Sequence, residues 1–435
     1  MRLLPLSALQ QRFWHLCTAY PGDASPILFL TWRIRGPLDL DRWQTAVSAV
    51  VDRHESLRTG FALRDGEPVQ VVGPPTGITT ELIDLSGQRD PDEQAQRVVS
   101  GRTHRLLDLI TGPLVESCLV RLAADHHVWC FTMHHLLADG ASLRIVGHEV
   151  RDCYAAPSGT ALPPLQTQYG DFARWQREQE ESDASQLAYW REQLIGVPPL
   201  DLPTDRPRPP HKGTASSELI HRMDGELATA VIGLSRAARC TPFMVLLAAL
   251  QVLLREHSGQ DDFAIGSPAG GRVRAEFEPV VGLFANTLAL RTDLTGDPTL
   301  RELLARTRKT VIGALQRQTF PFGRIVAALG PPRDPSRTQV FQVIFSMRND
   351  NEAKQPQLGP LLINDFPHGH PKVLHDLVFD IWRLDSHGLR AGIRYDTALF
   401  AHDTILALAR RYEQILSAAV TDPDARLSAL APPRG

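Results

Sequence analysis

The sequence has few cysteines, and their spacing suggests no covalent or metal framework. The 435 residues include five of them, at Cys17, Cys118, Cys130, Cys153 and Cys240. The number is odd and no two form a Cys-x-x-Cys pair, so neither a disulfide framework nor a zinc site is indicated. We expect reduced and mostly buried thiols.

Long apolar runs and an excess of charge of one sign are also missing. The most apolar window, Phe243 to Leu254, falls well short of the roughly 20 residues that span a bilayer. The N-terminus lacks the apolar core and cleavage site of a secretory signal. Since 46 Lys and Arg are balanced by 49 Asp and Glu, there is no basic field to hold nucleic acid. We expect a cytoplasmic monomer with no membrane and no nucleic-acid partner.

Four common catalytic or nucleotide-binding motifs are absent. Neither a phosphate-binding Gly-x-x-x-x-Gly-Lys-Ser/Thr nor a Gly-x-Gly-x-x-Gly occurs, which argues against nucleotide use. There is no Gly-x-Ser-x-Gly elbow of a serine hydrolase, and Gly270-Gly271-Arg272 is interpreted as a turn. The adjacent pair His134 and His135 does not share a helical face, and no His-Glu-x-x-His exists, so no metal site is expected.

What is present is an ordinary globular composition, 43% hydrophobic and 22% charged, with strand and helix patterns in alternation. This predicts a mixed α/β fold. We expect strands at 28–34, 61–63, 69–72, 114–122, 127–133, 378–384 and 389–395, with turns at Asp65-Gly66 and Asp385 to Gly388. We expect helices capped by Asp39 or Asp41, by Thr241 before Pro242, and by Thr299 with Glu302, and a final helix around 405–416.

Two proline-rich stretches divide the chain. Residues 156–168 and 197–213 flank a helical segment that looks like a bridge. We therefore expect an N-terminal lobe at 1–165, a bridging helix and linker at 166–215, and a C-terminal lobe at 216–435, with a cleft where the lobes meet.

The most informative segment is Met133-His134-His135-Leu136-Leu137-Ala138-Asp139-Gly140-Ala141-Ser142. Two histidines leave an apolar strand, and Asp139 and Gly140 begin a helix. The free N–H groups there favour developing negative charge, and an imidazole suits proton transfer near neutral pH. The alternative is that Asp139 only caps the helix and the histidines fill turn positions.

This segment resembles the His-His-x-x-x-Asp-Gly signature of the condensation domains of non-ribosomal peptide synthetases. Further segments resemble that family's motifs in the same order: Leu6–Trp14, Arg53–Phe61, Tyr169–Trp175, Val281–Arg291, Arg317–Phe322 and Arg333–Arg337. The resemblance covers essentially the whole chain. Thr319, Gly323 and Thr338-Gln339-Val340 depart from common family residues, which leaves the substrate and partner open.

The resemblance implies two lobes of the chloramphenicol-acetyltransferase type that form a V with a central tunnel. It implies an acyltransferase of natural-product or antibiotic biosynthesis that joins a carrier-tethered acyl or aminoacyl thioester to an amine or a hydroxyl, forming an amide or an ester. No cofactor is bound, since an acyl or peptidyl carrier protein supplies the phosphopantetheine arm. If Met1 is the natural start, the enzyme is free-standing; the C-terminal segment from Leu427 could equally be a cut linker.

The resemblance also assigns residue roles. His135 is the catalytic histidine, as base or as positioning group, and His134 beside it has a mostly structural part. Asp139 is expected to form a buried salt bridge with Arg58. The Gly140 N–H is our candidate to face the thioester oxyanion, because the absence of a Cβ permits close approach.

Two weaker candidates for substrate contact are Asn286 and Ala141. Asn286 could present its amide to substrate or be a structural residue at a strand end. Ala141 could line the pocket or be only a good helix former in the first turn.

Other functions within the same superfamily stay open. A non-catalytic recruitment domain is disfavoured by the intact His134, His135, Asp139 and Gly140. An acyl-coenzyme A-dependent relative would carry an Asp-Phe-Gly-Trp-Gly segment, which is absent, and an epimerase would differ around Phe284 to Thr287.

Overall fold

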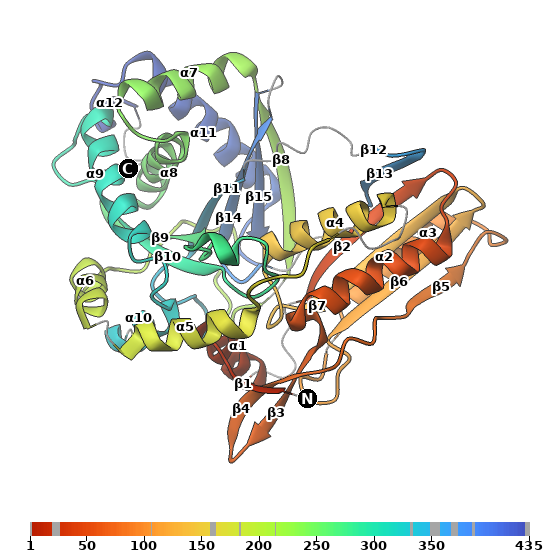
Figure 1. The fold of residues 1–435 in the computed structure, drawn as a ribbon. Coiled ribbons are helices and arrows are strands. Elements are labelled where there is room, and N and C mark those ends of the chain that lie inside the picture. The colour runs from red at the N-terminus through yellow and green to blue at the C-terminus, as the bar shows by residue number, and fades with distance from the viewer. Residues whose placement is uncertain are drawn as a thin grey trace. The chain divides into compact units, whose positions relative to one another are not determined.

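The computed structural model describes residues 2–19, 27–105, 107–156, 162–181, 184–213, 215–330, 334–348, 357–366, 373–384 and 388–430. The chain divides into two compact units (Figure 1). Unit 1 comprises Met1–Asp183, Gly270–Ala285 and Lys354–Gly369; unit 2 comprises Ala184–Ala269, Asn286–Ala353 and His370–Gly435. Two segments from the second half of the chain therefore belong to unit 1. The prolines predicted lobes that are continuous in sequence, with boundaries at 165 and 215, and this division differs from that prediction.

Unit 1 is built on a six-stranded sheet in the order β12-β13-β2-β7-β6-β5. Neighbouring strands are antiparallel except for the parallel pair β5 and β6. The strands are β2 (Ile27–Arg35), β5 (Thr80–Asp84), β6 (Val115–Ala123), β7 (His126–His134), β12 (Gln357–Leu358) and β13 (Leu361–Asp365). A separate sheet of order β1-β4-β3 contains β1 (Arg2–Pro5), β3 (Thr59–Arg64) and β4 (Glu67–Val72).

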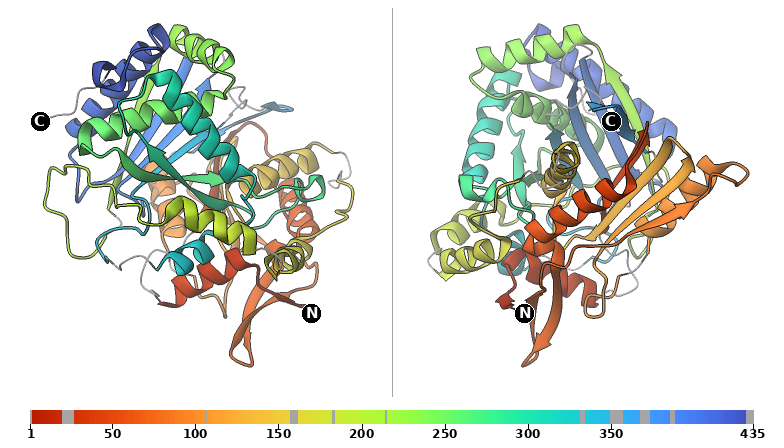
Figure 2. Two further views of the ribbon diagram at one scale, coloured as in Figure 1. Left: turned by 90° about the vertical axis from the view of Figure 1, so that its left-hand side faces the viewer. Right: turned by 45° about the vertical axis from the view of Figure 1, so that its right-hand side comes forward.

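Helices cover both faces of the larger sheet, and the alternation along β7 shows why. Trp129, Phe131 and Met133 pack with helices α2 and α4 in one apolar cluster, whereas Val128 and Cys130 pack with α3 in another. Successive side chains of a strand point to opposite faces, so a strand covered on both sides is apolar throughout. The helices of unit 1 are α1 (Ala8–Ala19), α2 (Leu40–Arg53), η1 (Glu55–Arg58), α3 (Pro91–Thr103), α4 (Gly140–Ala155), α5 (Tyr169–Glu181) and η2 (Ala275–Phe277). Figure 2 shows them in two further views.

Unit 2 contains a second six-stranded sheet, of order β10-β9-β11-β14-β15-β8. The neighbours β9, β11 and β14 are parallel and the remaining pairs antiparallel. Both units thus combine helices with mixed sheets, which confirms the expected α/β class. The strands are β8 (Ser216–Met223), β9 (Asp262–Ala269), β10 (Asn286–Asp293), β11 (Val343–Arg348), β14 (Leu377–Leu384) and β15 (Gly388–Asp396).

Helix α8 (Pro242–Ser258) lies at the centre of the core of unit 2. The Thr241 hydroxyl caps its start by accepting from the Met244 N–H, as expected, and Gly259, with φ of 70°, ends it. The helix is apolar on all sides and packs against α7, α9 and α11, as a fully buried helix must. The other helices are α6 (Ala184–Leu194), α7 (Gly225–Ala237), α9 (Leu300–Leu315), α10 (Phe322–Leu329), α11 (His402–Thr421) and α12 (Leu427–Leu430).

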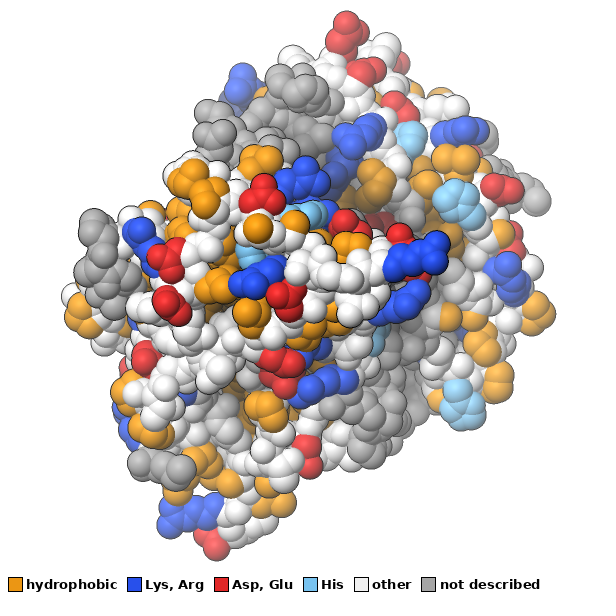
Figure 3. All heavy atoms as spheres, turned by 90° about the vertical axis from the view of Figure 1, so that its right-hand side faces the viewer, with side chains coloured by type: hydrophobic (Ala, Val, Ile, Leu, Met, Phe, Trp, Pro, Cys, Tyr) orange, Lys and Arg blue, Asp and Glu red, His pale blue; other side chains and the backbone are white. Residues whose placement is uncertain are grey.

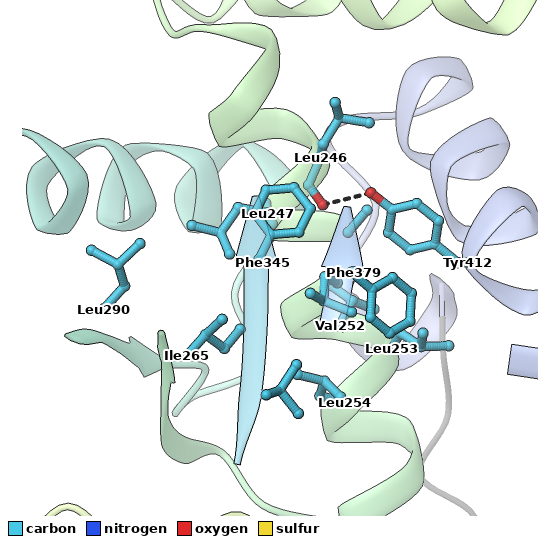
Figure 4. Close-up of a cluster of buried hydrophobic side chains, with 14 of the residues drawn as sticks. Leu246, Leu247, Val252, Leu253, Leu254, Ile265, Leu290, Phe345, Phe379 and Tyr412 are labelled. Carbon is cyan, nitrogen blue, oxygen red and sulfur yellow. Dashed lines mark hydrogen bonds between the residues drawn. The ribbon is translucent and has the colours of Figure 1, made fainter. Parts of the chain in front are cut away.

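Figure 4 shows side chains that fill this core. Phe345 and Phe379 of the sheet lie among the leucines of α8, and the Tyr412 hydroxyl donates a hydrogen bond of 2.9 Å to the Leu246 carbonyl. Burial raises the pKa of Tyr412 far above its ordinary value, so the phenol stays a neutral donor. One polar bond therefore satisfies the only polar atom that this aromatic side chain brings into the core.

Several expected elements are confirmed at their ends. Asp39 caps α2, the Asp65-Gly66 turn joins β3 and β4, and Thr299 with Glu302 forms both bonds of a capping box at α9. The turn expected at Asp385 to Gly388 lies, apart from Gly388, outside the described residues; β14 and β15 on either side of it are antiparallel neighbours.

The surface agrees with the near-balanced composition. On the face that Figure 3 shows, acidic and basic side chains are interspersed with apolar ones. Within the ranges described above, no single helix is long and apolar enough to cross a membrane; the bent pair α7 and α8 qualifies on length and composition alone.

Candidate active site

Strand β7 delivers the two motif histidines at its C-terminal end. His134 is the last strand residue, opposite Ile27 of β2, and its N–H donates to the Leu114 carbonyl at 2.9 Å. A short turn follows, in which the Leu137 N–H donates to the His134 carbonyl, and α4 begins at Gly140. The central strand of a sheet thus fixes the backbone that carries His135.

His134 is fully buried and used by this turn. Its Nδ1 accepts a hydrogen bond of 3.0 Å from the Leu136 N–H, and its Nε2 lies 3.9 Å from the Cys17 Sγ. Burial lowers the pKa of His134 to about 3, so the ring is a neutral acceptor. These contacts support the mostly structural part expected for it.

His135 is different, because it alone among residues 134–139 is partly exposed. Its ring stacks on Phe13 of α1, with centroids 4.8 Å apart and planes 22° from parallel. The buried Nδ1 has no hydrogen-bond partner in the described part of the chain. Burial lowers the pKa of His135 below its ordinary value, so at neutral pH the imidazole is uncharged and able to accept a proton.

Asp139 is buried, and hydrogen bonds surround its carboxylate. Oδ1 accepts from the Ser142 N–H at 2.8 Å, which is the N-cap bond of α4, and from the Ser142 hydroxyl at 2.8 Å. Oδ2 accepts from the N–H groups of Phe284 and Ala285, both at 3.0 Å. Arg272 binds both oxygens, at 2.9 and 3.1 Å.

The salt bridge predicted between Asp139 and Arg58 is wrong. The partner of Asp139 is Arg272, whose side chain is 9% exposed. Arg58 instead donates to the carbonyls of Asp52, at 3.3 Å, and of Gly73. Arg272 can reach Asp139 because the segment 270–285, although it comes from the second half of the chain, belongs to unit 1.

The charge of Asp139 follows from the same contacts. Burial by itself raises the pKa of the carboxyl, but the Arg272 guanidinium and the Ser142 hydrogen bonds act in the opposite direction, and the resulting pKa lies below the ordinary value. Asp139 is therefore an anion that holds the segment 270–285 and the start of α4 together.

The turn expected at Gly270-Gly271-Arg272 is what makes this pairing possible. Gly271 has φ of 67°, and a Cβ there would lie 2.0 Å from the Phe284 carbonyl oxygen. Arg272 also lies over the Phe284 ring, 4.2 Å from its centroid, and donates to the Val280 carbonyl at 3.1 Å. A side chain at position 271 would displace this stretch of chain from Asp139.

Other side chains that the motif analysis did not single out hold the same segment. His54 Nδ1 accepts from the Val281 N–H at 3.4 Å, while its Nε2 lies 2.7 Å from Glu149. The Ser56 hydroxyl donates to the Val281 carbonyl at 2.8 Å, and the Tyr169 hydroxyl to the Leu283 carbonyl at 2.9 Å. His54, Ser56 and Tyr169 all lie in segments that the sequence matched to the family, but nothing in their spacing reveals this shared target.

Gly140 and Ala141 occupy the first turn of α4. Gly140 is exposed, and a Cβ built on it would meet no described atom within 4 Å. Ala141 is half-buried. The first N–H groups of a helix have no partner within the helix, so the space beside Gly140 is compatible with the predicted oxyanion contact.

The substrate contact predicted for Asn286 is not supported. Asn286 begins β10 in unit 2 and is 4% exposed. Its Nδ2 donates to the carbonyls of Gln318, at 2.9 Å, and Phe320, at 2.6 Å, while its Oδ1 accepts from the Phe322 N–H at 3.1 Å. The amide is committed to the backbone that leads into α10, which is the structural alternative left open by the sequence.

Within the described ranges, no group of three or more His, Cys, Asp and Glu side chains is arranged to hold a metal ion. None of the five cysteines, all within these ranges, forms a disulfide. The motif itself brings His134, His135 and Asp139 to the end of β7, and Arg272 pairs with Asp139 there.

The comparisons with known proteins agree with the motifs. A family model described as "Condensation domain" matches residues 2–433. Malpinin synthetase of Mortierella alpina is 37% identical over 432 residues, which is 98% of this chain but 6% of that protein. Tyrocidine synthase 2 of Brevibacillus parabrevis is 36% identical over 433 residues, which is 97% of this chain and 12% of that protein. The chain thus spans only a small part of the length of these curated relatives.

Two solved structures are similar over nearly their whole length. The X-domain from teicoplanin biosynthesis has a TM-score of 0.87 and 28% identity, covering 98% of this chain and 96% of that one. The SgcC5 protein from Streptomyces globisporus, solved with a naphthyl ethanediol, has a TM-score of 0.76 and 28% identity, covering 97% and 100%.

Proposed function

This chain belongs to the condensation domain family, and we propose that it transfers an acyl or aminoacyl group from a carrier-bound phosphopantetheine thioester to an amine or hydroxyl acceptor. Acyl transfer by condensation is the general activity of the family. The carrier protein as donor and the two acceptor classes are our specific additions. No cofactor of its own is needed for this chemistry.

One observation supports the proposal above all. Of the polar side chains in the motif, only that of His135 has no hydrogen-bond partner among the described residues. His134 is bonded to the turn, and Asp139 accepts bonds from Ser142, Arg272 and two backbone N–H groups. A partly exposed, neutral imidazole on a rigid strand end is suited to meet an attacking group.

The reaction forms a C–N or C–O bond and breaks the C–S bond of the thioester. His135 either takes the proton of the attacking amine or hydroxyl or holds that nucleophile by a hydrogen bond; the proton finally reaches the departing thiolate. For a weakly acidic alcohol, the base role is the more effective one. The negative charge that develops on the carbonyl oxygen would meet the Gly140 N–H at the start of α4.

The experiment is mass spectrometry of carrier-loaded acyl substrate incubated with a panel of amines and alcohols. We expect amide or ester product with the wild-type chain and at least about a hundredfold less with His135→Ala, the typical effect of losing a positioned acid–base group. His148→Ala, an exposed histidine further along α4, is the matched control and should react as the wild type does. Equal turnover in all three proteins would contradict the role of His135.

A second candidate function is non-catalytic recruitment. It is favoured by the similarity to the teicoplanin X-domain, which is also solved in a complex with OxyB. In the same experiment this function predicts no product with any acceptor, together with retained binding of the carrier. The similarity to SgcC5, which is solved with a diol, supports including alcohols in the panel.

The tunnel between V-shaped lobes, the cytoplasmic location and the monomeric state stay predictions. So does the pocket role of Ala141. Each is independent of the panel experiment, which tests only the chemistry.

A further inference from the structure

A row of arginines crosses the sheet of unit 2. In the strand register, Arg348 of β11 lies opposite Trp382 of β14, Trp382 opposite Arg390 of β15, and Arg390 opposite Arg222 of β8. Residues directly opposite one another point to the same face of a sheet. The adjacent Ile381 and Ala391 belong to the helix-covered core, so this arginine row, Arg348, Arg390 and Arg222 around Trp382, faces away from the helices.

Few carboxylates of the described residues lie close to the arginine row; that of Glu218 is near Trp382, 3.1 Å from where a Cβ on Gly392 would be. Among the described residues, neither Arg390 nor Arg222 has a carboxylate within 4.0 Å, and the buried Nε of Arg390 has no hydrogen-bond partner. Arg348 is half-exposed and 3.9 Å from its nearest carboxylate, Asp380. Like charges directly opposite one another destabilise a sheet, so the pair Arg390 and Arg222 has a cost that no ion pair among the described residues offsets.

Asp380, the carboxylate 3.9 Å from Arg348, makes its shorter contacts elsewhere. Its Oδ2 accepts a hydrogen bond of 2.6 Å from Arg394, and its Oδ1 accepts from the Ser346 hydroxyl. Both partners lie away from the row along their strands. Among the described residues, Arg348 therefore has only this distant carboxylate, and no carboxylate lies within 4.0 Å of Arg390.

Trp382 positions the two arginines on either side of it, Arg348 and Arg390. The Arg390 guanidinium lies 4.2 Å from the centroid of the Trp382 ring and that of Arg348 lies 5.9 Å from it. The ring itself is 9% exposed and packs on Gly392, where a Cβ would lie 2.5 Å from it. Stacking on an aromatic ring fixes the guanidinium plane while leaving its N–H edge available.

We propose that the arginine row binds a phosphate ester and, resting on the proposed function, that this ester is the phosphate of the carrier's pantetheine arm. Guanidinium groups bind phosphate through paired, charge-assisted hydrogen bonds. A phosphate offers several oxygens in different directions, so it can accept from more than one arginine of the row, whereas a carboxylate offers one planar edge. An arm anchored by its phosphate leaves its thioester end free to react.

The test is equilibrium binding of phosphopantetheine, pantetheine and inorganic phosphate to the full chain, at constant ionic strength. We expect phosphopantetheine to bind at least tenfold more tightly than pantetheine or inorganic phosphate. The double variant Arg348→Gln/Arg390→Gln should lose this preference, while pantetheine binding stays the same. Arg410→Gln, an exposed arginine on α11, is the matched control, and thermal melts confirm that each variant is folded.

Arg390→Lys keeps the charge but not the planar fork, so we expect it to retain part of the preference even if the glutamine variant is poorly folded. Equal binding of phosphopantetheine and pantetheine to the wild type, or an unchanged preference in the folded double variant, would overturn the proposal. Inorganic phosphate binding as tightly as phosphopantetheine would overturn the assignment to the pantetheine arm. Failure of the proposed function is separate, since it is absence of acyl-transfer product from the wild-type chain.

Discussion

His135 and Asp139 are four residues apart in the motif and meet opposite electrostatic surroundings. Burial lowers the pKa of the His135 imidazole despite the opposing charge of Asp139, which favours the neutral ring. Burial beside Arg272 keeps the carboxyl ionised. The two side chains thus divide the motif into a neutral group available for proton transfer and an ionised group that fixes the backbone. Both pKa values are lowered, which leaves the histidine uncharged and the carboxyl charged near neutral pH.

The neutral state of His135 predicts how activity depends on pH. An uncharged imidazole is required to accept a proton or a hydrogen bond from the nucleophile, and lowering its pKa means that it remains uncharged at more acidic pH. We therefore expect the acid limb of the kcat/KM profile to fall below pH of about 6.5, the ordinary histidine value. Stopped assays across pH 4 to 8 measure this; an acid limb above that value would contradict the direction of the shift.

Ala141 allows a test of pocket size. If this half-buried residue lines the acceptor site, Ala141→Trp should reject a large acceptor while sparing a small one. Rates for a small and a large acceptor, with a thermal melt of the variant, decide the matter. An equal loss for both acceptors together with a lower melting temperature would place Ala141 in the core of α4.

At the scale of elements, the N-terminus of α4 is an anchor for the segment 270–285. The N-cap residue Asp139 accepts from the N–H groups of Phe284 and Ala285, and the Ser142 hydroxyl accepts from the Gly282 N–H. Removing one partner of a buried ion pair leaves the other charge without compensation. The stability of this part of unit 1 therefore depends on Arg272.

We expect Asp139→Ala and Arg272→Gln each to lower the free energy of unfolding by about 3 to 5 kcal/mol. Arg58→Gln, which removes two bonds to backbone carbonyls, should cost about 1 to 2 kcal/mol. Urea denaturation of single and double variants checks this. Coupling should appear for the pair Asp139/Arg272 and be absent for Asp139/Arg58; the reverse result would restore the pairing expected from the motifs.

Much of the element pattern could be predicted because it depends on local chemistry. The caps at Asp39, Thr241 and Thr299 each accept from the N–H group three residues further on, and the strand pattern of β7 reflects burial on both faces. The partner of Asp139 could not be predicted, since Arg272 lies 133 residues away and its approach depends on the left-handed Gly271. Gly270-Gly271-Arg272 was visible as a turn, but a turn does not reveal what its arginine contacts.

At the scale of the whole molecule, the two units are interleaved along the chain. Unit 1 needs Gly270–Ala285 and Lys354–Gly369, which come after most of unit 1 and amid unit 2. Proline-rich composition could predict the linker, but it could not predict that these two later segments belong to unit 1. Strand β13, for example, has only five residues, too few to show a sequence pattern that assigns it to one sheet.

This interleaving predicts that residues 1–183 alone do not fold stably. The fragment lacks Arg272, so Asp139 would be a buried, uncompensated carboxylate, and β2 would lose its neighbour β13. We expect a broad, non-cooperative thermal transition, measured by circular dichroism beside the full chain as control. A sharp transition with native-like dispersion of amide signals would show that the returning segments are dispensable.

The place of β13 in the sheet also sets an order of events during synthesis on the ribosome. At about 5 to 20 residues per second, translation from Asp183 to Gly369 takes on the order of 10 to 40 seconds. Throughout that interval one edge of β2 is unpaired, and such an edge can pair with other chains. The strands that cover this edge in the finished sheet, β13 and then β12, are made last. A nascent chain of this protein is therefore most exposed to misassembly while its second unit is being made, which is when binding by a chaperone would be of greatest use.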